Sequence, residues 1–442
     1  AGQWHPLGAV RAVTVPPGAT VLEPQVRADG PGRWRLGRLL LQVLPQRPTR
    51  AGSGGPAAGP EVNTGRGRIL LVTGAYPSPE HPFAGAFIHT RVQAYHALGA
   101  PVDVFEIGPR PDAAAGQREF EGITIATGGA AALQDLIATG LYRHVAVHVL
   151  TKNSWRAIRD WAGVVPLTVW VHGSEIQPWT KRRYDIVGAK ALESALANTH
   201  TRMAMWREVC AVPGLDLVFV SQTFRREVAA DLAAYGIDLA QVRTQVVPNP
   251  IDTGRFAGPP KDPAQRTKIL MIRTFFGRKY GTDLAVSAIG GLAAEPWFDE
   301  LEFTIAGDGP DFEATVAPLR EYANVQLWRG YLTHAQIAQL QASHGVMLMP
   351  TRWDSQGVSR DEAMAAGLVV ITNAVAAVPE FISDQEGYLA PADDWPAMAD
   401  AVRDLHAHPE VFAAKSAAAA ARVRATLAAP LIAAQELSLL ST

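Results

Sequence analysis

Two carboxylates stand on either side of a short polar loop in the segment MLMPTRWDSQGVSRDEAMAAG, residues 347 to 367. Asp354 and Glu362 are eight positions apart, with a glycine and two serines between them. Two acids held close together can act as a general acid and a general base, which is the first chemistry that this spacing suggests. Their ordinary alternative is to stabilise a helix start, where the helix dipole favours negative charge.

The same segment offers a second chemistry, which is the binding of phosphate. Gly357, Val358 and Ser359 are expected at or just before the first turn of the helix that carries Glu362. The first N–H groups of a helix have no partner within it and attract anions. In this arrangement Glu362 could accept hydrogen bonds from two ribose hydroxyls. Asp354, earlier in the loop, could reach a sugar beyond the phosphates.

Three cations follow another strand-like run in MIRTFFGRKYGTDL, residues 271 to 284. Arg273, Arg278 and Lys279 would suit a pyrophosphate, the arginines through paired hydrogen bonds and the lysine as a point charge. A solvated basic loop is the alternative. The position of the cluster directly after an expected strand favours the anion site.

Two loops in the N-terminal half carry further candidate residues. His172 follows a strand-like run in VWVHGSEIQPW and could donate to a sugar hydroxyl or a phosphate, or be a structural histidine bonded to the backbone. Gly85 and Ala86 precede an expected helix in GAYPSPEHPFAGAFIHTRV. Small residues there let backbone N–H groups approach an anion or a sugar, and structural turn glycines are the alternative. That loop lacks the GxGxxG pattern of a dinucleotide site.

Backbone contacts with a ligand are expected in two glycine-containing loops of the C-terminal half. Gly307 and Gly309 permit a tight turn after a strand in IAGDGP. In WRGYL, residues 328 to 332, an extended backbone ending at Leu332 could bond to the edge of a base.

All these loops need a scaffold, and the apolar runs predict one. Strand-like runs begin at RILLVTG, residues 68 to 74, and recur with helical stretches between them up to TQVVPN, residues 244 to 249. A second series restarts at KILMIRTF, residues 268 to 275. Apolar strands that alternate with helices predict parallel sheets covered on both faces. We therefore predict an α/β fold with two Rossmann-like, doubly wound domains that face each other across a cleft. The ligand belongs in that cleft, at the carboxyl ends of the strands.

The predicted domain boundaries follow from the connecting segments. Residues 1–66, rich in Pro, Gly and Arg, form an irregular N-terminal extension and linker. Residues 67–250 and 251–425 form the two domains, and residues 426–442 form a C-terminal helix that could pack back on the first domain. Within the extension, RWRLGRLLLQVL reads as an element packed on the main body or as a basic amphipathic helix that contacts membrane lipid.

Composition restricts the class of protein. The chain has 442 residues, of which 48% are hydrophobic and 19% charged, with a net charge of −2. This is the balance of a globular protein, without the basic field that would attract nucleic acid. The single cysteine, Cys210, cannot form an internal disulfide, so we expect a cytoplasmic protein. No apolar run reaches the roughly 18 residues of a membrane-spanning helix.

The chain from about residue 66 to residue 425 resembles the retaining glycosyltransferases of family 4, which have the GT-B fold. The matching motifs occur in that family's order: YPSPEHPFAGAFIHTRV, VHGSEI, VVPNPID, IRTFFGRKYGTDL, IAGDGP, RGYL, QGVSRDEAMAAGLVVIT and VPEFI. The resemblance implies transfer of a sugar from a nucleotide-sugar donor to an acceptor hydroxyl, with retention of the anomeric configuration. It implies no bound metal and no cofactor, because cations and helix N-termini stabilise the leaving diphosphate. Residues 67–250 would then form the acceptor side and residues 251–425 the donor side.

The resemblance also implies roles for individual residues. Arg273 and Lys279 are similar to the family's phosphate-binding Arg and Lys, and a spacing longer by one residue also lets Arg278 take the lysine's role. Glu362 is similar to the second Glu of the family's E-x7-E motif, which holds the ribose. The first position of that motif is Asp354, whose carboxylate sits one methylene, about 1.5 Å, further back.

Three other positions match the family's motifs. Val358 and Ser359 resemble the residues whose N–H groups bind phosphate, and His172 resembles the histidine that contacts the donor sugar.

Two other functions stay open at this point. A non-catalytic subunit that binds a nucleotide sugar would explain Asp354 in place of Glu. A sugar-nucleotide epimerase on the same fold is the second, although no additional acid–base set is recognisable. The sequence does not distinguish UDP, GDP and ADP in the donor, or a glycan, a lipid-linked molecule and a small molecule as the acceptor. It leaves the oligomeric state open as well.

Overall fold

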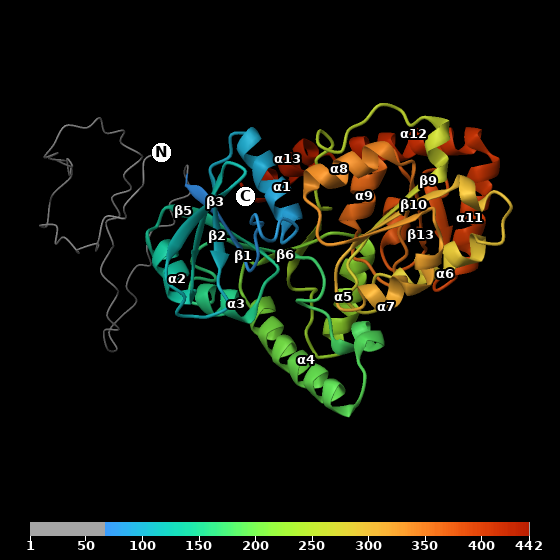
Figure 1. Ribbon diagram of the computed structural model, residues 1–442. Coiled ribbons are helices and arrows are strands. Elements are labelled where there is room, and N and C mark those ends of the chain that lie inside the picture. The colour runs from blue at the N-terminus through green and yellow to red at the C-terminus, as the bar shows by residue number, and fades with distance from the viewer. Residues whose placement is uncertain (1–66, 442) are drawn as a thin grey trace, which may run out of the picture. The chain divides into compact units, whose positions relative to one another are not determined.

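The computed structural model describes residues 67–441, which form two sheets with helices on their faces (Figure 1). The predicted N-terminal extension, residues 1–66, lies outside the described residues. The first sheet contains β1 (Arg68–Thr73), β2 (Val102–Ile107), β3 (Gly116–Phe120), β4 (Ile123–Gly128), β5 (Tyr142–His148), β6 (Leu167–Val171), β7 (Asp216–Phe219) and β8 (Arg243–Val246). The second contains β9 (Lys268–Ile272), β10 (Glu302–Gly307), β11 (Val325–Arg329), β12 (Val346–Leu348), β13 (Val369–Asn373) and β14 (Gly387–Ala390).

The helices that pack on the first sheet are α1 (Ala86–Ala97), α2 (Ala130–Ala138), α3 (Lys152–Ile158), α4 (Ala189–Cys210), α5 (Gln222–Ala233) and α13 (Ala429–Leu439). Those in the remainder are α6 (Thr282–Leu292), α7 (Phe312–Val316), α8 (His334–Ser343), α9 (Val358–Ala365), α10 (Val378–Phe381), α11 (Trp395–Ala407) and α12 (Pro409–Thr426). We call residues 67–246 together with α13 the first lobe, and residues 268–426 the second lobe.

Each sheet reverses its winding at one internal strand. The strand order is β3-β4-β2-β1-β5-β6-β7-β8 in the first sheet and β11-β10-β9-β12-β13-β14 in the second. β1 therefore lies between β2 and β5, and β9 between β10 and β12. Such switch points open a crevice at the carboxyl ends of the strands, which is where α/β proteins bind ligands.

Both faces of the inner strands of each sheet are buried, as expected from the apolar strands. Every residue of β6 and β13 is buried. In the first sheet, Leu133, Trp155 and Phe224 form part of a core on one face, and Ile88 and Ile432 form part of the core on the other. The second sheet is likewise covered by α6, α7 and α11 on one face and by α9 and α12 on the other. This confirms the predicted fold class of two doubly wound α/β domains.

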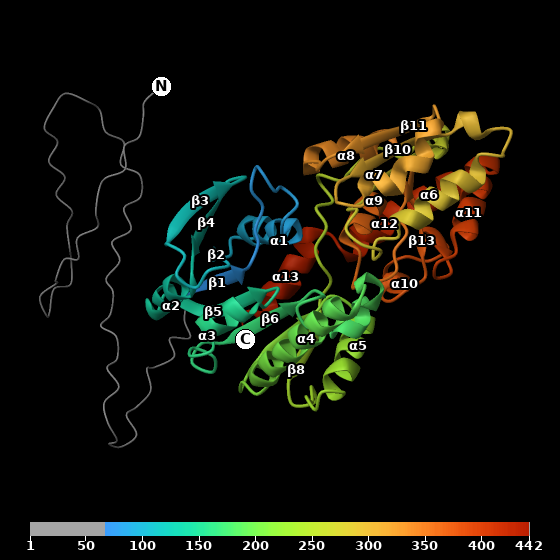
Figure 2. The same ribbon diagram turned by 60° about the horizontal axis from the view of Figure 1, so that its bottom comes forward.

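The chain returns to the first lobe at its C-terminal end. α13 follows α12 after a short connection and packs against α1, as Figures 1 and 2 both show. Ile432 and Ala433 are buried there in the same core as Val92 and Tyr95 of α1. A bridge between Ile251 and Ala428 joins the two crossings of the chain between the lobes.

A hairpin at the edge of the first sheet was not predicted. β3 and β4 pair antiparallel, and residues 121 and 122 form the turn between them. Glu121 has φ 44° and Gly122 has φ 79°, which is the backbone of a tight two-residue hairpin turn. β3 is exposed or half-buried along its length, so it lacks the apolar run that identified the other strands.

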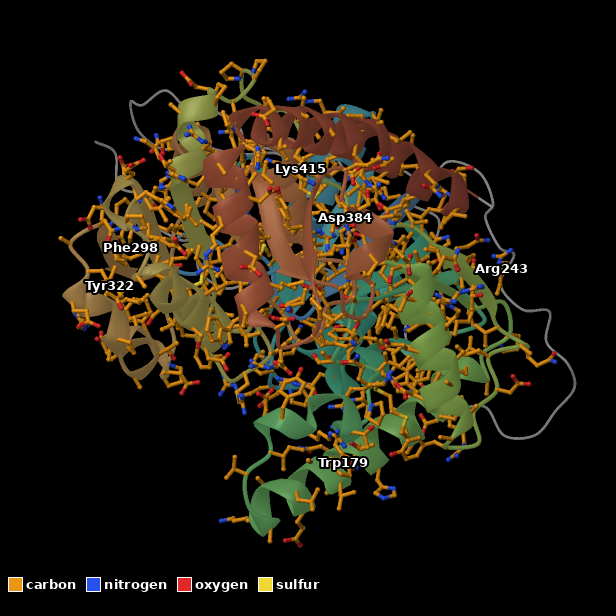
Figure 3. The ribbon with its side chains drawn as sticks, turned by 90° about the vertical axis from the view of Figure 1, so that its right-hand side faces the viewer. Trp179, Arg243, Phe298, Tyr322, Asp384 and Lys415 are labelled. Atoms are coloured by element: carbon orange, nitrogen blue, oxygen red, sulfur yellow. The ribbon has the colours of Figure 1, made fainter. Side chains whose placement is uncertain are left out.

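Side chains also fix loops of the second lobe, and Figure 3 labels the residues of two such pairs, Phe298 with Tyr322 and Lys415 with Asp384. Phe298 and Tyr322 pack edge to face with ring centres 5.2 Å apart. Lys415 of α12 donates to the backbone oxygens of Asp384 and, at 3.1 Å, Gly387. Within residues 67–441, none of the helices combines the length and the apolar character needed to cross a lipid bilayer.

Candidate active site

A pocket of about 240 Å³ lies at the carboxyl ends of strands from both lobes. The first lobe contributes a residue from the start of α1 and one from the loop after β6. The second contributes the loops after β9 and β12 and the start of α9. The lining residues are Phe87, His172, Asn249, Arg273, Lys279, Tyr280, Met349, Asp354, Ser355, Gln356, Gly357, Val358 and Ser359.

Half of the residues predicted from the sequence meet in this pocket. Those that line it are His172, Arg273, Lys279, Asp354, Gly357, Val358 and Ser359. Those that do not line it are Gly85, Ala86, Arg278, Gly307, Gly309, Leu332 and Glu362.

The start of α9 presents backbone donors to the pocket. Gly357 immediately precedes the helix with φ 108°, and a Cβ atom there would come within 2.9 Å of Nη1 of Arg360. The helix begins at Val358, so the N–H groups of Val358 and Ser359 precede its first i to i−4 hydrogen bond. The N–H groups of Arg360 and Asp361 turn back to the Gly357 carbonyl at 3.0 and 3.1 Å. This end of the helix is therefore suited to hold an anion.

Arg273 provides a buried positive charge beside these donors. Its side chain is held by one bond from Nη2 to the backbone oxygen of Pro350 at 3.2 Å and by the Tyr280 ring, 5.1 Å from the guanidinium. The Nε atom is buried and has no partner among residues 67–441. Burial lowers the pKa of Arg273, and the charge of Asp354 opposes this effect. The guanidinium thus keeps donors that are free to bind a ligand.

Lys279, rather than Arg278, is the second cation of the pocket. Lys279 Nζ lies 5.0 Å from the ring centres of both Tyr280 and Trp353, and no carboxylate of the described chain forms an ion pair with it. The exposed Arg278 pairs instead with Asp283 at 3.4 Å. The longer spacing noted in the sequence therefore still leads to a lysine in the pocket.

Asp354 is half-buried at the pocket wall. Its Oδ1 accepts a hydrogen bond of 3.4 Å from the Gln356 N–H, and its backbone oxygen accepts one of 3.3 Å from Ala377. These two bonds fix the loop at Asp354. The carboxylate stays available to a hydroxyl group in the pocket.

His172 enters the pocket as a neutral ring. Its Nε2 is 3.1 Å from Nδ1 of His148, and its ring centre is 4.7 Å from that of Phe87. Burial, with the nearby charge of Arg91, holds the pKa of His172 well below its ordinary value. A neutral imidazole offers hydrogen bonds to a ligand but no charge.

The loop after β6 is hydrogen-bonded to the second lobe at His172. The Glu175 carboxylate accepts the N–H groups of His172 and, at 2.9 Å, Gly173. The backbone oxygen of His172 accepts a bond of 2.6 Å from Ser355 Oγ. These bonds fix the histidine relative to the loop that carries Asp354.

Glu362 lies on α9 but is not part of the pocket wall. The half-buried carboxyl is affected mainly by burial and by the charge of Asp361, which raise its pKa to about 8, while Arg255 opposes them. Its predicted contact with a ribose stays a prediction.

The predicted glycines have structural reasons for their positions. Gly85 precedes α1 with φ 68°, and a Cβ atom there would lie 2.5 Å from the Ala75 carbonyl. A Cβ atom on Gly307 would lie 1.8 Å from the backbone oxygen of Arg273. A Cβ atom on Gly309 would lie 2.4 Å from the backbone oxygen of Phe275. The glycines after β10 therefore let that loop pack against the backbone that carries Arg273.

Two other predicted residues do not line the pocket. Ala86 is the first residue of α1 and adjoins the pocket residue Phe87. Leu332 is half-buried between β11 and α8.

Six pocket residues were not predicted from the sequence. They are Phe87, Asn249, Tyr280, Met349, Ser355 and Gln356. Tyr280 adjoins a predicted residue, and Ser355 and Gln356 stand between two of them, so their position in the loops was the available signal. Asn249 lies within the matched motif VVPNPID, but no role was assigned to it, because its contribution depends on where the connection between the lobes passes.

Comparison with known proteins adds two kinds of likeness. Residues 266–408 match the family model described as "Glycosyl transferases group 1". Lipopolysaccharide glucosyltransferase WaaG of Escherichia coli is 31% identical over 121 residues, which cover 27% of this chain and 31% of that protein. Lipopolysaccharide core biosynthesis mannosyltransferase LpsB of Rhizobium meliloti is 31% identical over 201 residues, covering 41% of this chain and 56% of that protein. The chain thus spans about a third to about half of the length of these relatives.

Solved structures resemble the chain over most of its length. Sucrose-phosphate synthase from Thermosynechococcus elongatus superposes with a TM-score of 0.64 at 16% identity, covering 84% of this chain and 98% of that one. A UDP-forming alpha,alpha-trehalose-phosphate synthase from Burkholderia vietnamiensis gives 0.63 at 14% identity, with coverages of 85% and 98%. At such identities the likeness shows the fold, which is the two-domain GT-B-like fold.

Proposed function

We propose that this chain is a glycosyltransferase that moves a sugar from a nucleotide-diphosphate sugar to a hydroxyl group of an acceptor, with retention of the anomeric configuration. The observation that carries the proposal is the meeting of Arg273, Lys279 and the N-terminus of α9 in one pocket. This places two cations and a set of backbone donors around a space that suits a diphosphate. The family-model match over residues 266–408 covers the same loops.

The proposed role of these groups is to stabilise the charge that develops on the leaving diphosphate. Fixed donors and cations aimed at developing charge are among the largest contributions to enzymatic rates. Arg273 and Lys279 would contact the phosphate oxygens, and Val358 and Ser359 would donate their N–H groups. We propose that this set takes the place of a metal ion, so that transfer proceeds without one.

The sugar would lie on the side of the pocket formed by His172 and Asp354. The neutral imidazole would exchange a hydrogen bond with a sugar hydroxyl, and the Asp354 carboxylate would accept another. In the transfer step, the bond between the anomeric carbon and the phosphate oxygen breaks. The acceptor oxygen bonds to the same face of that carbon, and its proton passes to an oxygen of the leaving diphosphate.

We propose a glycan or a lipid-linked glycan as the acceptor. The support is the two relatives named above, which are described as a lipopolysaccharide glucosyltransferase and a lipopolysaccharide core biosynthesis mannosyltransferase. The first-lobe side of the pocket, which would face this acceptor, is formed by Phe87 and His172.

The experiment begins with a thermal-shift screen of UDP-, GDP- and ADP-sugars, because a ligand that binds only the native state raises the melting temperature. The donor found is then incubated with the protein, with and without EDTA, and sugar release or transfer is followed. We expect turnover that EDTA leaves intact and a product with the donor's anomeric configuration by NMR. Binding without turnover would favour a non-catalytic subunit, and loss of activity that divalent metal restores would contradict the metal-free step.

A further inference from the structure

Gln356 connects the phosphate-binding start of α9 to the segment that crosses between the lobes. Its Oε1 accepts the N–H of Asn249 at 2.6 Å, and its Nε2 donates to the Asn249 carbonyl at 3.2 Å. Gln356 and Asn249 are 1% and 5% exposed, and both residues line the pocket. One amide side chain thus pairs with both backbone groups of a residue 107 positions away.

The same amide also holds the first turn of α9. Gln356 Nε2 donates to Oδ2 of Asp361 at 3.0 Å. Oδ1 of Asp361 accepts two bonds from Arg360, at 3.0 and 2.7 Å. Both of these helix residues are buried, so the turn that contains Val358 and Ser359 is fixed from inside the protein.

On the other side, the contacts continue into the first lobe. Asn249 Oδ1 accepts a bond of 3.3 Å from Arg91 of α1. Arg91 Nε lies 2.8 Å from both carboxylate oxygens of Glu436 on α13, and both side chains are fully buried. A continuous buried chain of polar contacts therefore runs from α13, through α1 and the crossing segment, to the first turn of α9.

The chemistry of the chain requires an amide at position 356. The contact with Asn249 N–H needs an acceptor, and the contacts with the Asn249 carbonyl and the Asp361 carboxylate need donors. A glutamate could accept the Asn249 N–H but would repel the Asn249 carbonyl and the Asp361 carboxylate. An apolar residue would leave all three groups without this partner. Buried polar groups that lose their partners are costly, so the loop would move to find others.

We infer that Gln356 is a positioning residue that sets the N–H groups of Val358 and Ser359 relative to Arg273 and Lys279. The inference rests on the proposed function, because it concerns the binding of the leaving diphosphate. Gln356 acts by holding the loop between Asn249 and Asp361, rather than by contact with the reacting atoms.

The test compares Gln356→Met and Gln356→Glu with Gln341→Met, which replaces an equally buried glutamine outside the pocket. The probe is inorganic pyrophosphate, titrated by calorimetry, so the result does not depend on the nucleotide. We expect a loss of affinity of about tenfold in both Gln356 variants and less than twofold in the Gln341 variant. Two variants of different chemistry keep the test valid if one of them fails to fold.

Hydrogen exchange of the protein without added pyrophosphate separates positioning from direct contact. Removal of a positioning residue makes the amides of residues 357–361 exchange faster than in the wild type and in Gln341→Met. Lower affinity with unchanged exchange would show that Gln356 only touches the ligand, and unchanged affinity would also overturn the inference. Failure of the wild type to bind either pyrophosphate or any nucleotide sugar would instead overturn the proposed function.

Discussion

Lys279 lies against the ring of Trp353, which belongs to the same lobe as Lys279 but packs on the other lobe. Lys279 Nζ is 5.0 Å from the centre of the Trp353 ring. The indole also packs edge to face on Phe224 of α5, with ring centres 5.7 Å apart, and donates from Nε1 to Glu227 at 3.2 Å. The position of the pocket cation therefore depends on how the second lobe's loop is seated on the first lobe.

Trp353→Leu tests this dependence. Loss of the ring removes the cation–π contact, which is worth about 0.5 to 2 kcal/mol, so we expect kcat/KM for the donor to fall about tenfold. Trp353→Phe keeps a ring under Lys279 and should retain most of the activity. Steady-state kinetics with saturating acceptor provide the measurement. Equal losses in both variants would show that the indole bond to Glu227, and not the ring, is what matters.

The two neighbouring basic residues should differ strongly in importance. Lys279→Met removes a pocket cation without an ion-pair partner in the described chain, and we expect kcat to fall by about 100-fold. Arg278→Met removes an exposed cation that pairs with Asp283, and it should change kcat by less than about threefold. A larger effect of the arginine would contradict the assignment of Lys279.

Asp354→Asn should separate phosphate binding from sugar transfer. The charge of Asp354 acts on Arg273, so its removal makes the pocket more positive. We expect pyrophosphate to bind roughly threefold more tightly, while kcat/KM for sugar transfer falls about tenfold because the carboxylate acceptor is lost. Calorimetry and kinetics on the same preparation measure the two effects. Weaker pyrophosphate binding would mean that the aspartate supports the cations instead of the sugar.

Glu362 predicts a pH dependence of stability. Its pKa is raised from 4.5 to about 8 in the folded protein by burial and by Asp361. Between these values the folded state binds more protons than the unfolded chain, so stability falls as the pH rises through this window and changes no further above it. Glu362→Gln lacks this titration, and its unfolding free energy should improve relative to the wild type from about pH 5 to about pH 8.5. Urea unfolding at several pH values measures the difference, and a difference between the two proteins that does not change with pH would contradict the prediction.

The buried pair between Arg91 and Glu436 should be important for stability. Both side chains are fully buried, and the carboxylate also accepts bonds from Tyr95 at 2.6 Å and Trp170 at 3.0 Å. Glu436→Gln leaves the guanidinium charge unpaired in the interior, and we expect a loss of about 3 kcal/mol in unfolding free energy. The exposed Glu410→Gln, on α12, is the matched control and should change stability little. Similar unfolding midpoints for both variants would contradict this.

The apolar strands made the architecture predictable, because a parallel strand buried on both faces is a continuous apolar run. The hairpin of β3 and β4 was not predicted, for the opposite reason. Its strands are partly exposed, and its turn places Glu121 at φ 44° where the usual signal is Asn or Asp before Gly. Segments that owe their structure to pairing at a sheet edge leave little trace in hydrophobicity.

The parts of the candidate site that depend on the backbone and on loop position were predictable from the sequence. The parts that depend on the direction of a side chain were less predictable. The start of α9 and the cations after β9 lie where the strand order requires loops to meet. Glu362 stands on the expected helix, yet its side chain is not in the pocket wall, because the helical turn directs it elsewhere. Asn249 and Gln356 come into contact only because the chain crosses between the lobes. Contacts between residues so far apart in the sequence cannot be predicted from local spacing.

The return of α13 has a consequence for how the protein matures on the ribosome. α13 supplies Ile432 and Ala433 to one core of the first lobe. It also supplies Glu436, which accepts hydrogen bonds from Arg91 and Trp170. That face of the first sheet stays incomplete until the second lobe has been synthesised. A nascent chain therefore exposes an unsatisfied arginine and an apolar surface during most of its elongation, which is the state that aggregates or recruits chaperones. Truncation after α12 should prolong that state indefinitely, and should damage the lobe that was made first.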